Sequence, residues 1–279
     1  MTPLRALMHD QMTLRHLSER TKHLYETAIA NLAVFYHQSP DHLDQDQVQQ
    51  YLLHLIEDRK LSWSSCNIAV SAFRFFYREV LKQPESVFSL PLRKSQKTIP
   101  HILSIEEVLR LITAPTNPKH RALLMTAYGA GLRVSETVRL QVRDIVSSRM
   151  LVRVEQGKGN KDRYTILPPR LLAELRSYWR LCRPDAWLFP GRDPLHHLSR
   201  GAAQKIYYRA KELAGITRPG GIHILRHCFA THYLETGGDI FTLKRMLGHN
   251  AITSTTRYLH LLSCNLPQGK SPLDLLPSP

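Results

Sequence analysis

Residues 223–258 read HILRHCFATHYLETGGDIFTLKRMLGHNAITSTTRY, and this stretch decides both the fold and the chemistry. Its apolar periodicity from His223 to Thr236, closed by two glycines, predicts a helix. Asp239 follows as a good N-cap for the next helix. The stretch therefore predicts consecutive helices that carry histidine, arginine and tyrosine side chains.

His223 and Arg226 are three residues apart, which places an imidazole and a guanidinium group on one face of the predicted helix. A guanidinium group offers a planar fork of donors to two phosphate oxygens, and an imidazole exchanges a proton near neutral pH. The pair is therefore suited to hold one phosphate.

The motif Leu247-Gly248-His249 puts a histidine at a helix end, and Tyr258 follows nine residues later. An unperturbed phenol has a pKa of ~10, so it attacks phosphorus usefully only where cations and a proton acceptor favour the phenolate. Tyr258 is the candidate nucleophile.

Arg133 lies in the stretch GAGLRVSE, residues 129–136, just after glycines that permit a tight bend. This position makes it a candidate phosphate clamp. The alternative is a surface arginine paired with Glu136, three residues on.

Lys158 lies in GKGNKDR, residues 157–163, between two strand-like runs. This pattern predicts a β-hairpin whose basic tip reaches a phosphate or a leaving group, or else a solvated turn. The spacing is not that of a Walker A loop, so nucleotide binding is not supported.

The histidines of this region also raise the possibility of a metal site, with His223, His227, His232 and His249 as ligands. No HExxH signature is present, and His227 and His232 are interpreted as packing or capping residues. Cys228, on an apolar helix, is interpreted as structural.

The chain is strongly basic: Lys and Arg number 38 against 23 Asp and Glu, a formal charge of +15. Such a balance favours nucleic acid, although composition does not separate DNA from RNA or from an anionic membrane surface. The four cysteines form no CxxC pair, and no signal peptide or 18-residue apolar span is found. We expect a soluble, cytoplasmic protein that does not bind membranes.

Two domains are expected. A helical pattern from Glu19 to Gln83 predicts a small N-terminal helical domain, and the basic segment Pro91–Pro100 predicts an extended connection. The predicted boundaries are residues 1–92 for the first domain, 93–101 for the linker, 102–263 for the second domain and 264–279 for a proline-rich tail.

The second domain is expected to begin at Ser104, where Ser104 and Glu107 match a capping box with Leu103 and Val108 as its hydrophobic staple. Strands are predicted at Leu151–Val154 and Tyr164–Leu167, and a helix around Ser199–Ala214. The predicted fold class is mainly α with a small β-sheet.

Taken in order, GLRVSE, GKGNKDR, HILRHCFATHYLETGGD and LGHNAITSTTRY closely resemble the tyrosine recombinase family, especially its Xer-type and integron-integrase branches. The resemblance covers about Ser104 to Leu262. It implies an N-terminal helical core-binding, SAM-like domain followed by a mixed α+β catalytic domain.

The resemblance also implies roles for six residues. Arg133 and Arg226 would hold the scissile phosphate, Lys158 would protonate the leaving 5′-hydroxyl, and His223 would assist proton transfer. His249 would donate to a nonbridging oxygen, and Tyr258 would be the nucleophile that forms a 3′-phosphotyrosyl intermediate. No metal or nucleotide cofactor is implied.

The family acts on double-stranded DNA as a tetramer, made of one recombinase or shared with a paralogous partner. Two departures stand out: the tail is proline-rich instead of helical, and Cys228 stands where relatives often have serine or alanine. The alternatives are a catalytically silent DNA-binding regulator with this fold and a relaxing topoisomerase.

Overall fold

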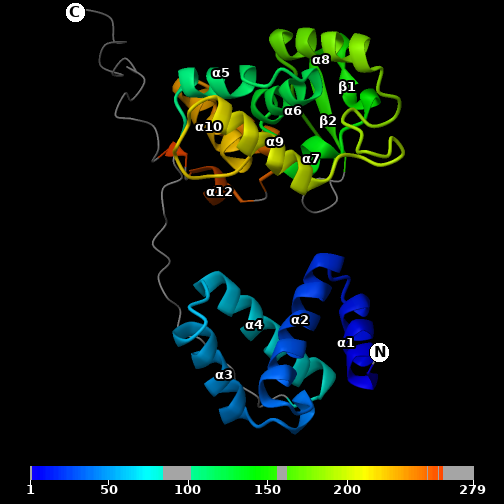
Figure 1. Cartoon of the computed structure of the whole chain (residues 1–279), viewed down its shortest axis with the longest axis vertical. Coiled ribbons are helices and arrows are strands. Elements are labelled where there is room, and N and C mark those ends of the chain that lie inside the picture. The colour runs from blue at the N-terminus through cyan, green and yellow to red at the C-terminus, as the bar shows by residue number, and fades with distance from the viewer. Residues whose placement is uncertain (1, 84–101, 156–161, 250, 257, 260–279) are drawn as a thin grey trace, which may run out of the picture. The chain divides into compact units, whose positions relative to one another are not determined.

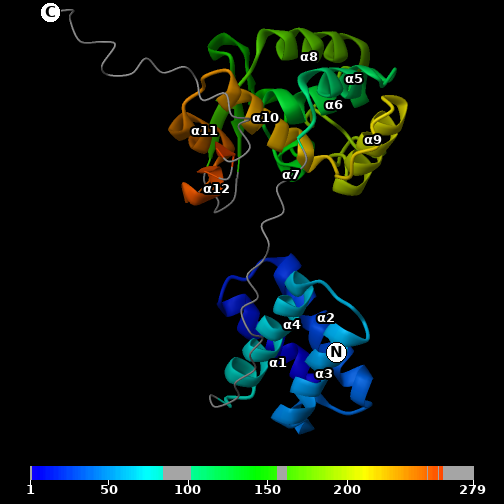
Figure 2. The same ribbon diagram turned by 90° about the vertical axis from the view of Figure 1, so that its left-hand side faces the viewer.

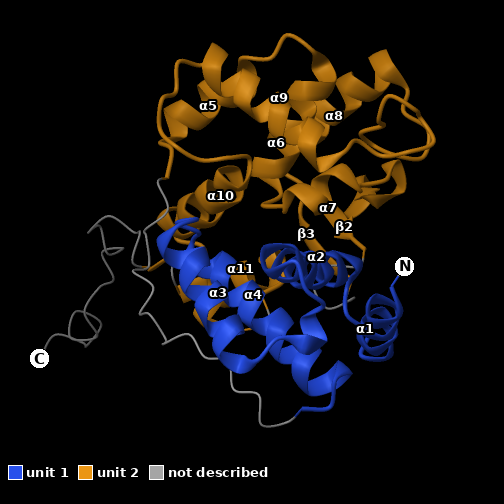
Figure 3. Cartoon of the chain, turned by 60° about the horizontal axis from the view of Figure 1, so that its bottom comes forward, with its two compact units in different colours: residues 1–97 blue, residues 98–279 orange. Residues whose placement is uncertain are grey.

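The computed structural model describes residues 2–83, 102–155, 162–249, 251–256 and 258–259. The chain divides into two compact units, residues 1–97 and residues 98–279 (Figure 3). Each unit has its own cluster of buried apolar side chains. The predicted linker up to residue 101 and the predicted tail lie outside the described residues.

Unit 1 is helical, as the sequence predicts. Its elements are α1 (Pro3–Leu14), α2 (Glu19–Tyr36), the 3-10 turn η1 (Pro40–His42), α3 (Gln45–Glu57), α4 (Trp63–Phe75) and the π-helical turn η2 (Phe76–Val80). Ser18, Asp44 and Ser62 cap α2, α3 and α4 by accepting hydrogen bonds from backbone N–H groups. The core of the unit includes the fully buried Met12, Leu32, Leu52 and Phe73.

Unit 2 is a helical body with one small sheet (Figures 1 and 2). Its helices are α5 (Ile105–Thr113), α6 (Pro118–Gly129), α7 (Val134–Val138), α8 (Pro169–Cys182), α9 (Arg200–Leu213), α10 (His223–Glu235), α11 (Ile240–Leu247) and α12 (Thr253–Thr256). The 3-10 turns η3 (Val142–Asp144) and η4 (Ser147–Arg149) flank the first strand. The predicted capping box is present: Ser104 caps α5 and exchanges hydrogen bonds with Glu107.

The sheet has three antiparallel strands in the order β1 (Ile145–Val146), β2 (Leu151–Val154) and β3 (Arg163–Ile166). The predicted strand Leu151–Val154 is confirmed, whereas the strand predicted at Tyr164–Leu167 both begins and ends one residue earlier, at Arg163 and Ile166. Thr165, buried on β3, donates a hydrogen bond to the carbonyl of Ala130, which ties the sheet to the turn after α6. The tip of the hairpin, residues 156–161, lies outside the described residues.

Helix α10 is largely buried: most of its residues from Ile224 to Leu234 lie in the core. It packs against α5, α6 and α11. Cys228 accepts a hydrogen bond from the backbone N–H of Leu103 at 3.3 Å, and His232 contacts the carbonyl of Leu103 at 3.1 Å. Cys228 and His232 are therefore structural residues, as predicted, and together they hold the start of the described part of unit 2 on this helix.

Within the part of the chain that the structure describes, no helix combines the length and the apolar character that a membrane crossing needs.

Candidate active site

Arg133 lies at the N-cap of α7, where the chain leaves the turn that follows α6. Its backbone N–H donates to Oε2 of Glu136 at 2.8 Å, and its Nη1 donates to Oε1 at 2.7 Å. The pairing with Glu136 considered from the sequence is thus present. It does not make Arg133 an isolated surface residue, because Glu136 is shared with two further arginines.

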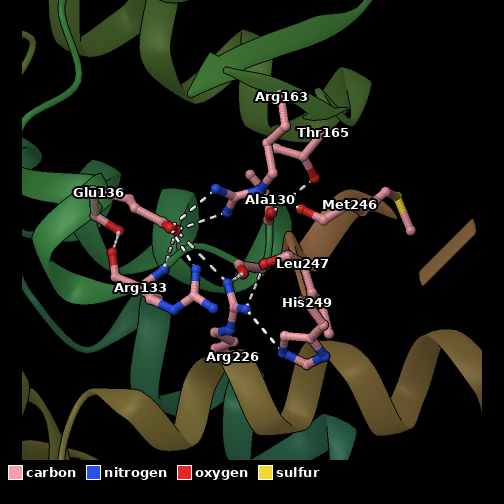
Figure 4. Close-up of polar contacts among 11 residues, drawn as sticks. Ala130, Arg133, Glu136, Arg163, Thr165, Arg226, Met246, Leu247 and His249 are labelled. Carbon is pink, nitrogen blue, oxygen red and sulfur yellow. Dashed lines mark hydrogen bonds and ion pairs between the residues drawn. The ribbon is translucent and has the colours of Figure 1, made fainter. Parts of the chain in front are cut away.

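Glu136 is the centre of this cluster (Figure 4). Arg163, the first residue of β3, donates to both its carboxylate oxygens at 3.0 and 2.8 Å, and Arg226 of α10 lies 3.6 Å from Oε2. Burial alone would raise the pKa of Glu136, but the hydrogen bonds and charge of Arg163, the Arg133 N–H and the Arg226 cation lower it to about 2. Glu136 is therefore ionised at neutral pH.

Arg226 is buried and held from several sides. Its Nη1 donates to the carbonyl of Gly131 at 2.9 Å, and its Nη2 donates to the carbonyl of Leu247 at 2.7 Å. Nη2 also lies 3.2 Å from Nε2 of His249. Burial and the nearby Arg133 cation lower the pKa of Arg226 to about 10, which still leaves it charged at neutral pH.

Gly131 makes this arrangement possible. Its φ is +62°, a conformation that disfavours residues with a Cβ, and a Cβ there would overlap the ring of Phe229 on α10. The turn after α6 therefore approaches α10 closely enough for the carbonyl of Gly131 to accept from Arg226. As a result, Arg133 and Arg226 act on one another electrostatically.

Three guanidinium groups, those of Arg133, Arg163 and Arg226, thus face one carboxylate in a partly buried cluster. With three positive charges and one negative charge, these four residues carry two net positive charges. A cluster with such an excess attracts an anion, and forked guanidinium donors suit the oxygens of a phosphate.

His249 lies on the turn after α11, where Gly248 adopts a left-handed conformation with φ +63°. Its Nδ1 is 2.8 Å from the hydroxyl of the buried Thr255, and its Nε2 faces Arg226. Because a guanidinium group only donates, Nε2 accepts in this state, which leaves the ring proton on Nδ1 to donate to Thr255. Figure 4 shows His249 next to Arg226 in the cluster.

Tyr258 is almost fully buried, with 1% of its surface exposed. Its ring is nearly parallel to that of His249, with 6.5 Å between the ring centroids. Its hydroxyl is 3.0 Å from Nδ1 of His227 on α10. The structure therefore brings Tyr258 to the cluster that holds Arg226 and His249.

His227 is a functional candidate, although its sequence context suggests a packing or capping residue. The structure instead places it on the hydroxyl of the predicted nucleophile. A signal was available: His227 is four residues after His223 and next to Arg226, so it lies on the helix surface close to both. Arg163 was also missed, although it ends the GKGNKDR motif.

His223 is the first residue of α10 and is exposed. Partial desolvation lowers its pKa, and the Arg226 and Arg133 cations lower it further. The charges that act on His223 thus belong to the same cluster. Lys158 lies outside the described residues. The strand that follows it, β3, begins at Arg163, and Arg163 binds Glu136. The base of the predicted hairpin is therefore connected to the cluster.

The described residues contain no group of three His, Cys, Asp or Glu side chains that could hold a metal ion. Of the histidines considered as ligands, His232 contacts the hydroxyl of Tyr128 and the carbonyl of Leu103 through its two ring nitrogens.

Comparison with known proteins gives a consistent result. The phage integrase family matches residues 101–263, and the N-terminal SAM-like domain of phage integrases matches residues 4–86. A putative integrase/recombinase of Sinorhizobium fredii is 41% identical over 282 residues, covering 100% of this chain and 91% of that protein. A tyrosine recombinase XerD of Staphylococcus epidermidis is 33% identical over 238 residues, covering 79% of each chain.

Solved structures agree in fold. The crystal structure of XerA recombinase is 27% identical, with a TM-score of 0.54 and 92% of each chain covered. A lambda integrase dimer bound to a core site has a TM-score of 0.68 at 20% identity, covering 91% of this chain and 97% of that one.

Proposed function

Because this chain belongs to the phage integrase family and is a site-specific tyrosine recombinase that acts on DNA, we propose that it cuts and rejoins duplex DNA through Tyr258. The phenol oxygen attacks the scissile phosphorus, the P–O5′ bond breaks, and the 3′ phosphate becomes bonded to the tyrosine. The observation that carries the proposal is the position of Tyr258 beside His249 and Arg226 in one cluster.

Arg133 and Arg226 hold the phosphate in this proposal. The excess positive charge of their cluster is partly buried, where electrostatic interactions are stronger than in water. The donors are already oriented by Glu136, Gly131 and Leu247, so little reorganisation is needed when charge develops on the phosphate oxygens.

Other residues carry out the proton transfers and the remaining hydrogen bonding in this proposal. Lys158 protonates the departing 5′ oxygen, and His223 assists proton transfer at the phosphate. His249, whose Nε2 accepts from Arg226 in the structure, donates a hydrogen bond to a nonbridging oxygen in its protonated form. The phosphotyrosyl bond keeps the energy of the broken diester, so a 5′-hydroxyl of a partner strand attacks it and religates without ATP. Neither a metal nor a nucleotide takes part.

The partner is double-stranded DNA, consistent with the net charge of +15. Residues 1–92 serve as the core-binding domain and residues 102–263 as the catalytic domain. A homotetramer assembled on two duplexes, or a tetramer shared with a paralogous recombinase, provides the four strand cuts. The reaction belongs in the cytoplasm, where widely spaced cysteines stay reduced.

The test is to trap the covalent adduct. Protein is incubated with nicked suicide DNA duplexes from its own genetic locus, denatured, and the adduct is mapped to a residue and a cut position. We expect a 3′-phosphotyrosyl adduct at Tyr258 with the wild type, and none with Tyr258→Phe.

Tyr208→Phe is the matched control, since Tyr208 is an exposed tyrosine on α9 and should leave the adduct unchanged. An adduct that persists in Tyr258→Phe would disprove the assigned nucleophile. Tight, salt-sensitive DNA binding without any adduct would instead favour a catalytically silent DNA-binding regulator.

A further inference from the structure

Tyr258 has to lose a proton to become a strong nucleophile, and the roles given above do not say which group accepts it. Its ordinary pKa of ~10 leaves little phenolate at neutral pH. With 1% of its surface exposed, the residue has little access to water as an acceptor. The acceptor is therefore best sought among the protein groups next to the hydroxyl.

Nδ1 of His227 is 3.0 Å from the hydroxyl of Tyr258, within the reach of a proton transfer. The other two imidazoles near the cluster are engaged differently. His249 uses its nitrogens toward Arg226 and Thr255, and the charges acting on His223 are those of Arg226, Arg133 and Glu136. His227 is thus the imidazole that the geometry places on the phenol.

We propose that His227 is the general base of the cleavage step and accepts the hydroxyl proton of Tyr258. This inference rests on the proposed role of Tyr258 as the nucleophile. As the Oη–P bond forms, the proton moves from Oη to Nδ1 of His227, the P–O5′ bond breaks, and O5′ takes a proton from Lys158. Religation reverses each transfer, so His227 returns the proton to Tyr258.

The position of His227 on α10 supports this role. It is adjacent to Arg226, so one helix fixes both the base and a phosphate ligand. The neighbours Leu225 and Cys228 are fully buried, which anchors that turn of the helix in the core. Among the described residues, the charged and titratable groups near the pair include Arg226 and His223 on the same helix and His249 on the turn after α11. The Arg226 cation favours the phenolate that the transfer produces.

The experiment compares two leaving groups in single-turnover cleavage. One nicked suicide duplex carries the natural phosphodiester, and the other carries a 5′-bridging phosphorothiolate, whose thiol leaves without being protonated. Lys158→Ala lacks the proposed acid, so it should cleave the natural substrate slowly. It should cleave the phosphorothiolate at close to the wild-type rate, because the thiol leaves without being protonated. His227→Gln should slow both substrates by about 100-fold or more, because general base catalysis is lost at the attacking oxygen.

Controls separate catalysis from folding. Glu235→Gln changes an exposed residue of the same helix and should cleave like the wild type. DNA affinity and thermal unfolding of His227→Gln should match the wild type. Cleavage of both substrates within about threefold of the wild-type rate, or rescue of His227→Gln by sulfur, would overturn the proposal.

A second measurement does not depend on catalysis. In the wild type, the phenol donates to Nδ1 and favours the neutral imidazole, so the 15N signals of His227 should titrate at lower pH than in Tyr258→Phe. Identical titrations would overturn the inference. If the wild type forms no adduct with either substrate, the proposed role of Tyr258 fails. The 15N titration of the wild type and Tyr258→Phe still decides whether the His227–Tyr258 contact exists.

Discussion

Glu136 is a buried carboxylate that three guanidinium groups share. Breaking a buried ion pair on one side leaves uncompensated charge, which is costly in free energy. Here the removal of a single carboxylate would leave three like charges together. Glu136 therefore contributes both to folding and to the placement of the arginines proposed to bind phosphate.

We expect Glu136→Gln to reduce the free energy of unfolding at neutral pH by on the order of 3 kcal/mol, since a carboxyl pKa lowered to about 2 stabilises the folded state by that amount. Urea denaturation at pH 7 measures the change. The exposed Glu235→Gln is the control and should unfold like the wild type. Equal stability of both variants would contradict the role given to Glu136.

The lowered pKa of Glu136 also predicts how the free energy of unfolding depends on pH. The pKa of Glu136 is lower in the folded than in the unfolded protein, so its contribution is fully present above its ordinary pKa of 4.5 and is lost as the pH falls toward 2. The wild type should lose more stability than Glu136→Gln across this interval. Parallel curves would show that the carboxylate is not the group responsible.

The sequence predicts part of this site, because its residue types and spacing suit phosphate chemistry. The structure brings the predicted residues close together: Arg133, Arg226, His249 and Tyr258. The sequence does not predict Arg163 or His227 as site residues. Their partners, Glu136 and Tyr258, lie 27 and 31 residues away in the chain, so the contacts depend on tertiary folding. Local spacing indicates which side chains share a helix face but not which distant group they meet.

The turn after α6 fixes the distance between two elements of the site. Gly131→Ala should reduce the free energy of unfolding by about 2 kcal/mol or more, because the residue is left-handed and the added methyl group overlaps Phe229. Gly201→Ala is the matched control, since Gly201 is an exposed residue in the first turn of α9, and a Cβ there would make only an ordinary contact with Oγ of Ser199 at 3.9 Å. That change should be neutral or stabilising.

Thermal and urea unfolding of both glycine variants tests this prediction, with Tyr258 adduct formation as a second readout. If Gly131→Ala is as stable as the wild type and forms the adduct equally fast, then the close approach of this turn to α10 is not required.

Elements with local sequence signals were predicted well. The capping box of Ser104 and Glu107 and the glycine that closes α9 involve neighbours in the chain. Strand β1 is not predictable from the sequence, because it has only two residues and is defined by their pairing with β2. Helix α1 was missed too, since its apolar face is recognisable only once Met8 and Met12 meet the core of unit 1.

The two units of the molecule have separate cores, so residues 1–97 should fold without the rest of the chain. We expect this fragment to show helical circular dichroism and a cooperative thermal transition. Leu52→Ala, in the core, should cost about 2–5 kcal/mol, whereas Leu53→Ala, at an exposed position on the same helix, should cost little. A fragment without a cooperative transition would show that unit 1 needs unit 2.

The two-part plan was predictable because the hydrophobic periodicity of residues 19–83 and the capping signal at Ser104 flank a basic, proline-bounded segment. The predicted limits of the linker and of the tail stay predictions, since those segments lie outside the described residues.

The arginines that share Glu136 are far apart in the sequence, and their order relative to Tyr258 determines when each part of the site is synthesised. During synthesis, Arg133 and Glu136 leave the ribosome about 90 residues before Arg226, because chains emerge from the N-terminus. Tyr258 follows 32 residues after Arg226. A nascent chain that has not reached residue 258, or one stopped before it by a nonsense codon, thus lacks the proposed nucleophile. We expect such a chain to form no covalent adduct with DNA.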